Sequence, residues 1–297
     1  MKILVTGASG LVGQALVRSL ESKGHGVLRL VRKAPAGGGE VRWDPSAGTI
    51  DAAALEGIDA AVHLAGENLA EGRWTEEKKR RIRESRVEGT RLISETLAAL
   101  ARKPEVLVSA SAVGFYGSRG DEVLTERSAA GDDFLAGVCR EWEEATAAAE
   151  GAGLRVVHLR FGVILSGEGG ALKKMLTPFR MGVGGKLGDG RQYVSWVTLD
   201  DAVAAIEHAL SVESLSGPVN VVAPRPVTNE EFTKAMGGAL SRPTFFPVPA
   251  FAARLAFGEM ADATLLSSQR AEPARLTESG FVFKYPEIEG ALRHVLK

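Results

Sequence analysis

Three glycines near the N-terminus are of the type and spacing that bind a phosphate group. Gly7 and Gly10 lie between an apolar run at Lys2–Val5 and a stretch at Leu11–Ser22 whose apolar residues have helical spacing, and Gly13 lies at the start of that stretch. Glycine tolerates the tight turn and lets a pyrophosphate approach the backbone amides at a helix N-terminus. The strand, turn and helix in this order therefore predict a dinucleotide site. The other residues expected to contact the cofactor in this turn are Ser9, Leu11 and Val12.

Arg32 ends the second apolar run, Gly26–Val31, and bears on which dinucleotide is bound. An NAD enzyme usually places an acid here, about 20 residues after the glycines, to accept a hydrogen bond from the ribose 2′-hydroxyl. A guanidinium cannot accept that bond, but it binds a 2′-phosphate well, so NADP is expected in preference to NAD. The alternative is that Arg32 and Lys33 are only the solvated end of a strand. Arg29 is a weaker candidate because it does not share the period-two face of Arg32.

Apolar runs of strand length alternate with helical patterns over most of the chain. This alternation predicts an α/β fold, a Rossmann-type doubly wound parallel sheet with a smaller C-terminal lobe. The expected strands are 2–5, 26–31, 40–43, 60–65, 106–110, 155–159, 193–197 and 218–222, and the expected helices are 11–22, 76–101, 134–150, 171–180, 199–210, 229–240 and 251–257.

The regular alternation is interrupted by two glycine-rich stretches, and prolines gather towards the C-terminus. We therefore expect residues 1–165 and 191–223 to form the NADP-binding domain. Residues 166–190 and 224–297 would form a smaller lobe on the substrate side.

Bulk composition limits the classes of partner and the compartment. The 36 Lys and Arg residues nearly balance the 37 Asp and Glu residues, so no overall field attracts nucleic acid or an anionic membrane. A small-molecule substrate is expected, and the oligomeric state is left open. The single cysteine, Cys139, cannot form an internal disulfide, which suits a reducing compartment. With no signal-peptide pattern and no run of membrane-spanning length, a soluble, cytoplasmic protein is expected.

Several motifs together resemble the extended short-chain dehydrogenases/reductases. They are Thr6–Gly13, Asp59–Gly66, the stretch that ends in Tyr116-Gly117, and Val197–Asp201. A narrower set looks like an atypical, largely uncharacterised branch, the NAD-dependent epimerase/dehydratase "epimerase family proteins", which carry a small C-terminal domain of unknown function. That set comprises Ala65–Leu69, Arg73-Trp74, Ser85-Arg86 and Pro178–Gly185. The resemblance covers almost the whole chain.

The resemblance implies further contacts with the cofactor. Leu64, Ala65 and Gly66 would line it, Asp44 would meet the adenine edge, and Arg86 would reach it from the long helix. Glu67 directly follows this lining and could act as a carboxylate near the nicotinamide; the alternative is a contact with the ribose or with the backbone. For Arg86 the alternative is a solvated helix surface, because it follows a run of basic residues. No His, Cys and carboxylate group has ligand spacing, so no metal site is expected.

The catalytic pair of the superfamily is absent. Classical members use a Tyr with a Lys four residues later, whose ammonium lowers the pKa of the tyrosine. The three tyrosines here are followed at that spacing by Gly120, Val197 and Glu289. The surviving candidates for catalysis are Tyr116, which follows a strand, and Ser111. Without a neighbouring cation the pKa of Tyr116 should stay near 10, and a pocket-wall role for this residue is the alternative.

Two functions fit these residues. The first is an NADP-dependent oxidoreductase or nucleotide-sugar-type epimerase that acts by hydride transfer. The second is a non-catalytic protein that holds NADPH as a regulator or sensor. The glycine turn and Arg32 suit both, and the missing Tyr and Lys favour the second.

Overall fold

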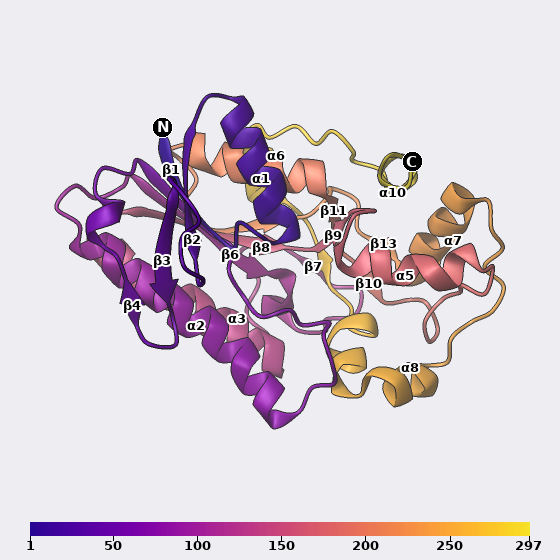
Figure 1. The fold of residues 1–297 in the computed structure, drawn as a ribbon. Coiled ribbons are helices and arrows are strands. Elements are labelled where there is room, and N and C mark those ends of the chain that lie inside the picture. The colour runs from indigo at the N-terminus through magenta and orange to yellow at the C-terminus, as the bar shows by residue number, and fades with distance from the viewer.

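A single eight-stranded sheet forms the centre of the protein (Figure 1), in a computed structural model that describes residues 1–297. Across the sheet the strands are β12 (Gly217–Val221), β8 (Arg155–Phe161), β6 (Val106–Ala112), β5 (Ala60–His63), β1 (Lys2–Thr6), β2 (Gly26–Val31), β3 (Glu40–Asp44) and β4 (Thr49–Ile50). All neighbours are parallel except β4, which runs antiparallel to β3. The predicted α/β sheet is therefore confirmed.

Helices cover both faces of this sheet (Figure 1). Alternate strand residues point to opposite faces, so Ile3 and Val5 join a core with α1 (Leu11–Ser22) and α6 (Leu199–Ser211). Leu4 joins the core on the other face with α2 (Glu76–Ala99) and α4 (Ala147–Gly151), where α3 (Phe134–Glu144) also packs against α2. The strands are apolar on both faces because both are buried, which is the doubly wound arrangement.

A second group of elements lies beyond the carboxyl ends of the strands. Helices α5 (Gly170–Arg180), α7 (Asn229–Leu240) and α10 (Ile288–Val295) share a core around Phe179, Phe232 and Leu292. The remaining elements are β9 (Val163–Leu165), β11 (Trp196–Thr198), β10 (Tyr193–Val194), β13 (Val227–Thr228), β7 (Val123–Leu124), β14 (Arg270–Ala271), α8 (Ala250–Phe257), α9 (Ala274–Glu278), 3₁₀ helices at Ala53–Leu55 and Val113–Tyr116, and a π-helical turn at Ala261–Leu265. No helix is at once long enough and apolar enough to cross a membrane.

Two expected elements are each divided in two. The predicted helix 134–150 breaks between α3 and α4 at Thr146, a fully buried residue whose hydroxyl bonds to the Glu143 carbonyl at 2.8 Å and to His158 Nε2 at 2.9 Å. The predicted strand 193–197 breaks at Ser195, whose hydroxyl bonds instead to backbone groups of Gln269 and Ala271. In both places a polar side chain takes over bonds that a continuous element would make through its backbone.

A buried carboxylate fastens the C-terminal segment to the sheet domain. Asp201 lies in the first turn of α6 and accepts backbone N–H groups of Lys284 at 2.8 Å and Tyr285 at 3.0 Å. The Thr198 hydroxyl donates a third bond to the same carboxylate at 3.0 Å. Because Asp201 is buried, water cannot replace these donors.

Replacing Asp201 with Asn should lower the free energy of unfolding by about 2 kcal/mol, since an amide NH₂ would face backbone N–H donors and leave one unpaired. Urea denaturation followed by circular dichroism measures this. The matched control is Asp200→Asn, which removes only a half-exposed pair with His294 and should cost much less. Equal losses for the two variants would contradict the anchoring role of Asp201.

Candidate functional site

The glycine-rich turn lies at the point where the sheet changes its winding direction. After β1 the chain moves to β2 on one side, whereas after β5, the other neighbour of β1, it moves away to β6. In open α/β sheets the loops that follow two such strands leave a crevice at their carboxyl ends, where ligands bind. The two loops here are Gly7–Gly10 and the segment that begins at Leu64.

Two of the three glycines are required by close contacts. Gly7 has φ +66°, and a Cβ there would lie 2.7 Å from the Leu64 carbonyl carbon. A Cβ on Gly13 would lie 2.2 Å from the Gly7 oxygen, so helix and turn touch only because neither residue has a side chain. Gly10 is the N-cap of α1 and provides no side-chain cap. The first-turn amides of α1 therefore remain open to an anion.

The Thr6 hydroxyl links β1 to the loop after β5. It accepts the N–H groups of Leu64 at 3.1 Å and Ala65 at 3.2 Å, and it lies 2.8 Å from His63 Nδ1. Because the oxygen already receives two N–H groups, its own hydrogen goes to Nδ1, and the imidazole carries its proton on Nε2. Burial lowers the pKa of His63 to about 4, so the ring is neutral at pH 7. His63 is thus an interior structural group.

The segment after β5 forms a wall directly against the glycine turn. It contains Leu64, Ala65 and Gly66, which are half-buried or exposed and so accessible from the crevice. Helix α2 holds the next residue, Glu67, at three points. Its N–H lies 3.0 Å from Ser85 Oγ, its carbonyl accepts Arg86 Nη2 at 3.1 Å, and its carboxylate pairs with Lys78 Nζ at 2.7 Å. That pairing lowers the pKa of Glu67.

Arg86 lies beside this wall and not on a solvated helix surface. Its guanidinium is 5.0 Å from the Trp142 ring, and a Cβ on Gly66 would lie 3.4 Å from its central carbon. Its hydrogen bonds go to the carbonyls of Ile82 and Glu67, and it forms no ion pair with a carboxylate. Burial lowers its pKa. Arg86 is only partly exposed and lacks a paired carboxylate, so the site is suited to receive a negative or oxygen-rich group.

Arg32 follows β2 at the same end of the sheet. Its side chain is exposed and has no hydrogen-bond or ion-pair partner, whereas Arg29 is occupied by Glu21. Asp44 ends β3, and its Oδ1 caps its own turn by accepting the N–H groups of Ser46 and Ala47, which leaves Oδ2 free. Ser9 is exposed at the tip of the glycine turn, and its hydroxyl is unpaired.

Tyr116 lies inside the protein, in a polar cluster. Its hydroxyl donates to Asn220 Oδ1 at 2.7 Å and accepts from Arg160 Nη1 at 3.1 Å, and the residue is 0% exposed. The expectation that it has no neighbouring cation is therefore wrong. Burial nevertheless raises the pKa of Tyr116, because desolvation of the phenolate outweighs the opposing effect of Arg160. Arg160 is itself engaged by the Glu143 carboxylate at 2.7 and 2.8 Å.

Ser111 belongs to the same cluster, since its hydroxyl donates to Glu143 Oε1 at 2.6 Å. Both proposed catalytic hydroxyls are thus buried and already hydrogen-bonded, which is how structural groups are held. Their catalytic role stays a prediction that this geometry does not favour. On α3, burial raises the pKa of Cys139 to about 12, so this thiol is not a nucleophile at neutral pH.

Sequence reasoning missed the side chains that position the site. Thr6 and Lys78 are buried and bond to the wall, and Glu143 and Arg160 form the polar cluster. Thr6 is marked only by its place before Gly7, and Lys78 lies within a basic run that resembles an ordinary solvated helix face. Nothing in the local sequence distinguishes the other two.

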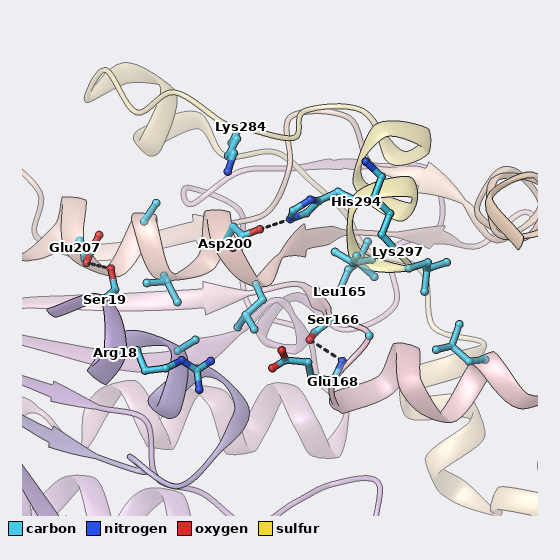
Figure 2. Close-up of a pocket in the computed structure, with 18 of the residues that line it drawn as sticks. Arg18, Ser19, Leu165, Ser166, Glu168, Asp200, Glu207, Lys284, His294 and Lys297 are labelled. Carbon is cyan, nitrogen blue, oxygen red and sulfur yellow. Dashed lines mark hydrogen bonds and ion pairs between the residues drawn. The ribbon is translucent and has the colours of Figure 1, made fainter. Parts of the chain in front are cut away.

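A large cavity of about 790 Å³ lies on the α1 and α6 side of the sheet (Figure 2). Arg18, Lys284 and Lys297 line it together with Glu168 and Asp200, so its charges are mixed. It does not include the glycine turn or the wall. We therefore place the candidate site by the stereochemistry of the turn and not by cavity size.

The chain matches two family models. The first, the NAD dependent epimerase/dehydratase family, matches residues 3–222. The second, a domain of unknown function named DUF1731, matches residues 248–295.

Individual relatives match over nearly the whole chain. An epimerase family protein of Mycobacterium bovis is 46% identical over 290 residues, which are 98% of this chain and 96% of the relative. The crystal structure of the human epimerase family protein SDR39U1 with NADPH is 35% identical, superposes with a TM-score of 0.92 and matches over 99% of each chain. A nucleoside-diphosphate sugar epimerase of Corynebacterium glutamicum is 43% identical with a TM-score of 0.83, and this chain covers 58% of it. The turn, the sheet and these matches together show that the chain belongs to the NAD dependent epimerase/dehydratase family.

Proposed function

We propose that this protein binds NADPH and acts as an oxidoreductase or epimerase on a small molecule. The observation that carries the proposal is the unpaired, exposed Arg32 at the end of β2, beside a glycine turn whose first-turn amides are open. Human SDR39U1, which resembles this chain over 99% of its length, was crystallised with NADPH. When bound, NADPH supplies a hydride for the reduction of a carbonyl carbon.

The residues present fit the parts of this cofactor. The amides of the glycine turn and the N-terminus of α1 would hold the pyrophosphate. Arg32, with Lys33 beside it, would bind the 2′-phosphate, and the free Oδ2 of Asp44 suits the adenine amino group. The wall of Leu64, Ala65 and Gly66 would line the cofactor, with Arg86 behind it.

Proton transfer would have to come from the wall side of the crevice. The Tyr116 hydroxyl is buried. The ionisable pair that adjoins the wall of Leu64, Ala65 and Gly66 is Glu67 with Lys78. The side chain of Lys78 is 5% exposed and that of Glu67 is 31% exposed, so the carboxylate is the more accessible member of the pair. Lys78 keeps Glu67 ionised, so we propose Glu67 as a general base for a substrate hydroxyl or as a substrate-orienting group.

A non-catalytic NADPH-binding protein is the second candidate. The observation that favours it is the burial of both catalytic hydroxyls, Tyr116 and Ser111, in a fully bonded cluster. Steady NADPH oxidation with a panel of aldehydes, ketones and nucleotide sugars would support the enzyme. Tight binding without oxidation of NADPH by any of them would support the second candidate.

The remaining proposals concern partners and location. A net charge of −1 and a single cysteine suit a small-molecule substrate and a reducing compartment such as the cytoplasm, with neither nucleic acid nor membrane as a partner.

Replacing Arg32 with Glu should reverse the cofactor preference, because a carboxylate repels the 2′-phosphate and accepts from a 2′-hydroxyl. We expect NADPH affinity to fall by about tenfold or more, the equivalent of one charge-assisted hydrogen bond, while NADH affinity rises. Fluorescence titration with both cofactors measures this. The control is Arg29→Gln on the same strand, which should leave the preference unchanged. An unaltered preference in Arg32→Glu would refute the role of Arg32.

Replacing Tyr116 with Phe should leave NADPH affinity unchanged and lower the free energy of unfolding by about 1–2 kcal/mol, since Asn220 and Arg160 each lose a buried partner. Calorimetry and urea denaturation measure the two effects. Turnover of any substrate found should also persist. A loss of turnover with unchanged stability would instead show that the hydroxyl is catalytic.

A further inference from the structure

The loop between β5 and α2 is held by several bonds near Glu67, which we call its root, and by fewer bonds at residues 70–73, which we call its tip. We name residues Gly66–Trp74 the strap loop. At its root, α2 holds Glu67 through Ser85, Arg86 and Lys78. At its tip, residues 70–73 are exposed; Asn68 bonds to Ala70 and Glu71, and Trp74 Nε1 donates to the Leu69 carbonyl across the tip at 2.9 Å.

Two bonds join the tip to the elements beyond the sheet. Lys174 Nζ on α5 donates to the Ala70 carbonyl at 2.6 Å, and Arg73 donates to the Leu255 carbonyl on α8. Neither cation has a carboxylate partner, and each donates to a backbone carbonyl oxygen. Hydrogen bonds from a charged donor are stronger than neutral ones, and here they hold an otherwise exposed segment in place.

The bond from Lys174 links two segments that each begin in contact with the glycine turn or with the helix that follows it. On one flank of the turn, Gly7 touches the backbone of Leu64, where the strap loop begins. On the other flank, Cβ atoms built on Gly169 and Gly170 lie 3.3 and 3.4 Å from the Leu11 side chain. Gly170 and Lys174 are one turn apart on the same face of α5. The bond to Ala70 therefore joins the two flanks beside the open N-terminus of α1, and Figure 1 shows this loop running from the sheet towards α5 and α8.

We propose that the strap loop closes over the phosphates of the bound dinucleotide and that Lys174 is the latch which holds it closed. The inference rests on the proposed function. A dinucleotide seated on the α1 amides lies between the turn and the strap loop, so its release requires the Ala70 bond to break. The elements beyond the sheet thereby control how long the cofactor stays bound, and Lys174 is a positioning residue that acts through the loop.

The test is the rate of NADPH release, measured by stopped-flow fluorescence after displacement with excess NADP⁺. Lys174→Met keeps the apolar stem and removes the donor, so release should accelerate by about tenfold, the loss of one charged hydrogen bond, while association stays near the wild-type rate. Deuterium exchange at residues 70–73 should rise in the same variant. Lys174→Arg should restore slow release, because a guanidinium also donates to a carbonyl.

The matched control is Lys173→Met, the neighbouring lysine, whose Nζ donates to the Glu168 carbonyl away from the strap loop. Its release rate should equal that of the wild type, and urea denaturation should show both variants folded. Release from Lys174→Met at the wild-type rate would overturn the latch alone. Slower association with unchanged release would also overturn it, because Lys174 would then only attract the cofactor. A wild-type protein that binds no NADPH would refute the proposed function, and the latch with it.

Discussion

The Thr6 hydroxyl is the contact on which the geometry of the site depends. It receives the N–H groups of Leu64 and Ala65 and donates to His63, so one oxygen joins the ends of two neighbouring strands. These bonds draw Leu64 so close to Gly7 that no side chain fits between them. They also end β5, because the next two amides turn to the hydroxyl and away from the sheet. The wall of the crevice and the glycine turn are thus two parts of one hydrogen-bonded unit at the switch point.

Some of the positive charge near this unit is not paired with a carboxylate. Several basic side chains of the site are neutralised, as Arg160 is by Glu143 and Lys78 by Glu67. Arg32, Arg86 and Lys174 have no carboxylate partner, and Arg86 is mostly buried. The ligand is therefore the expected source of negative charge, which a dinucleotide with three phosphate groups supplies.

The sequence predicted the strands and helices that are long enough to show a periodic apolar pattern. The predicted strands at 2–5 and 26–31 and the helix at 11–22, which the structure has at Lys2–Thr6, Gly26–Val31 and Leu11–Ser22, follow from apolar periodicity and from glycines whose positions demand a turn. Strands of two or three residues, such as β4 and β9, have too few residues to show a period. The site divides in the same way. Gly7 and Gly13 are recognisable because they lie in a local pattern, whereas the network of Glu143, Arg160 and Asn220 is assembled by three elements distant along the chain.

The chemistry is constrained by where that network lies. A catalytic tyrosine needs a nearby cation to lower its pKa, and Tyr116 has one in Arg160. Burial penalises the phenolate more than Arg160 stabilises it, so the pKa of Tyr116 rises. The same hydroxyl bonds to Asn220 on β12, where it ties the 3₁₀ helix to the sheet. A hydroxyl with both partners inside the protein is held as structural groups are, which does not favour a catalytic role. The Glu67 carboxylate is partly exposed and its ion pair with Lys78 keeps it ionised, so this group is suited to accept a proton and not to donate one.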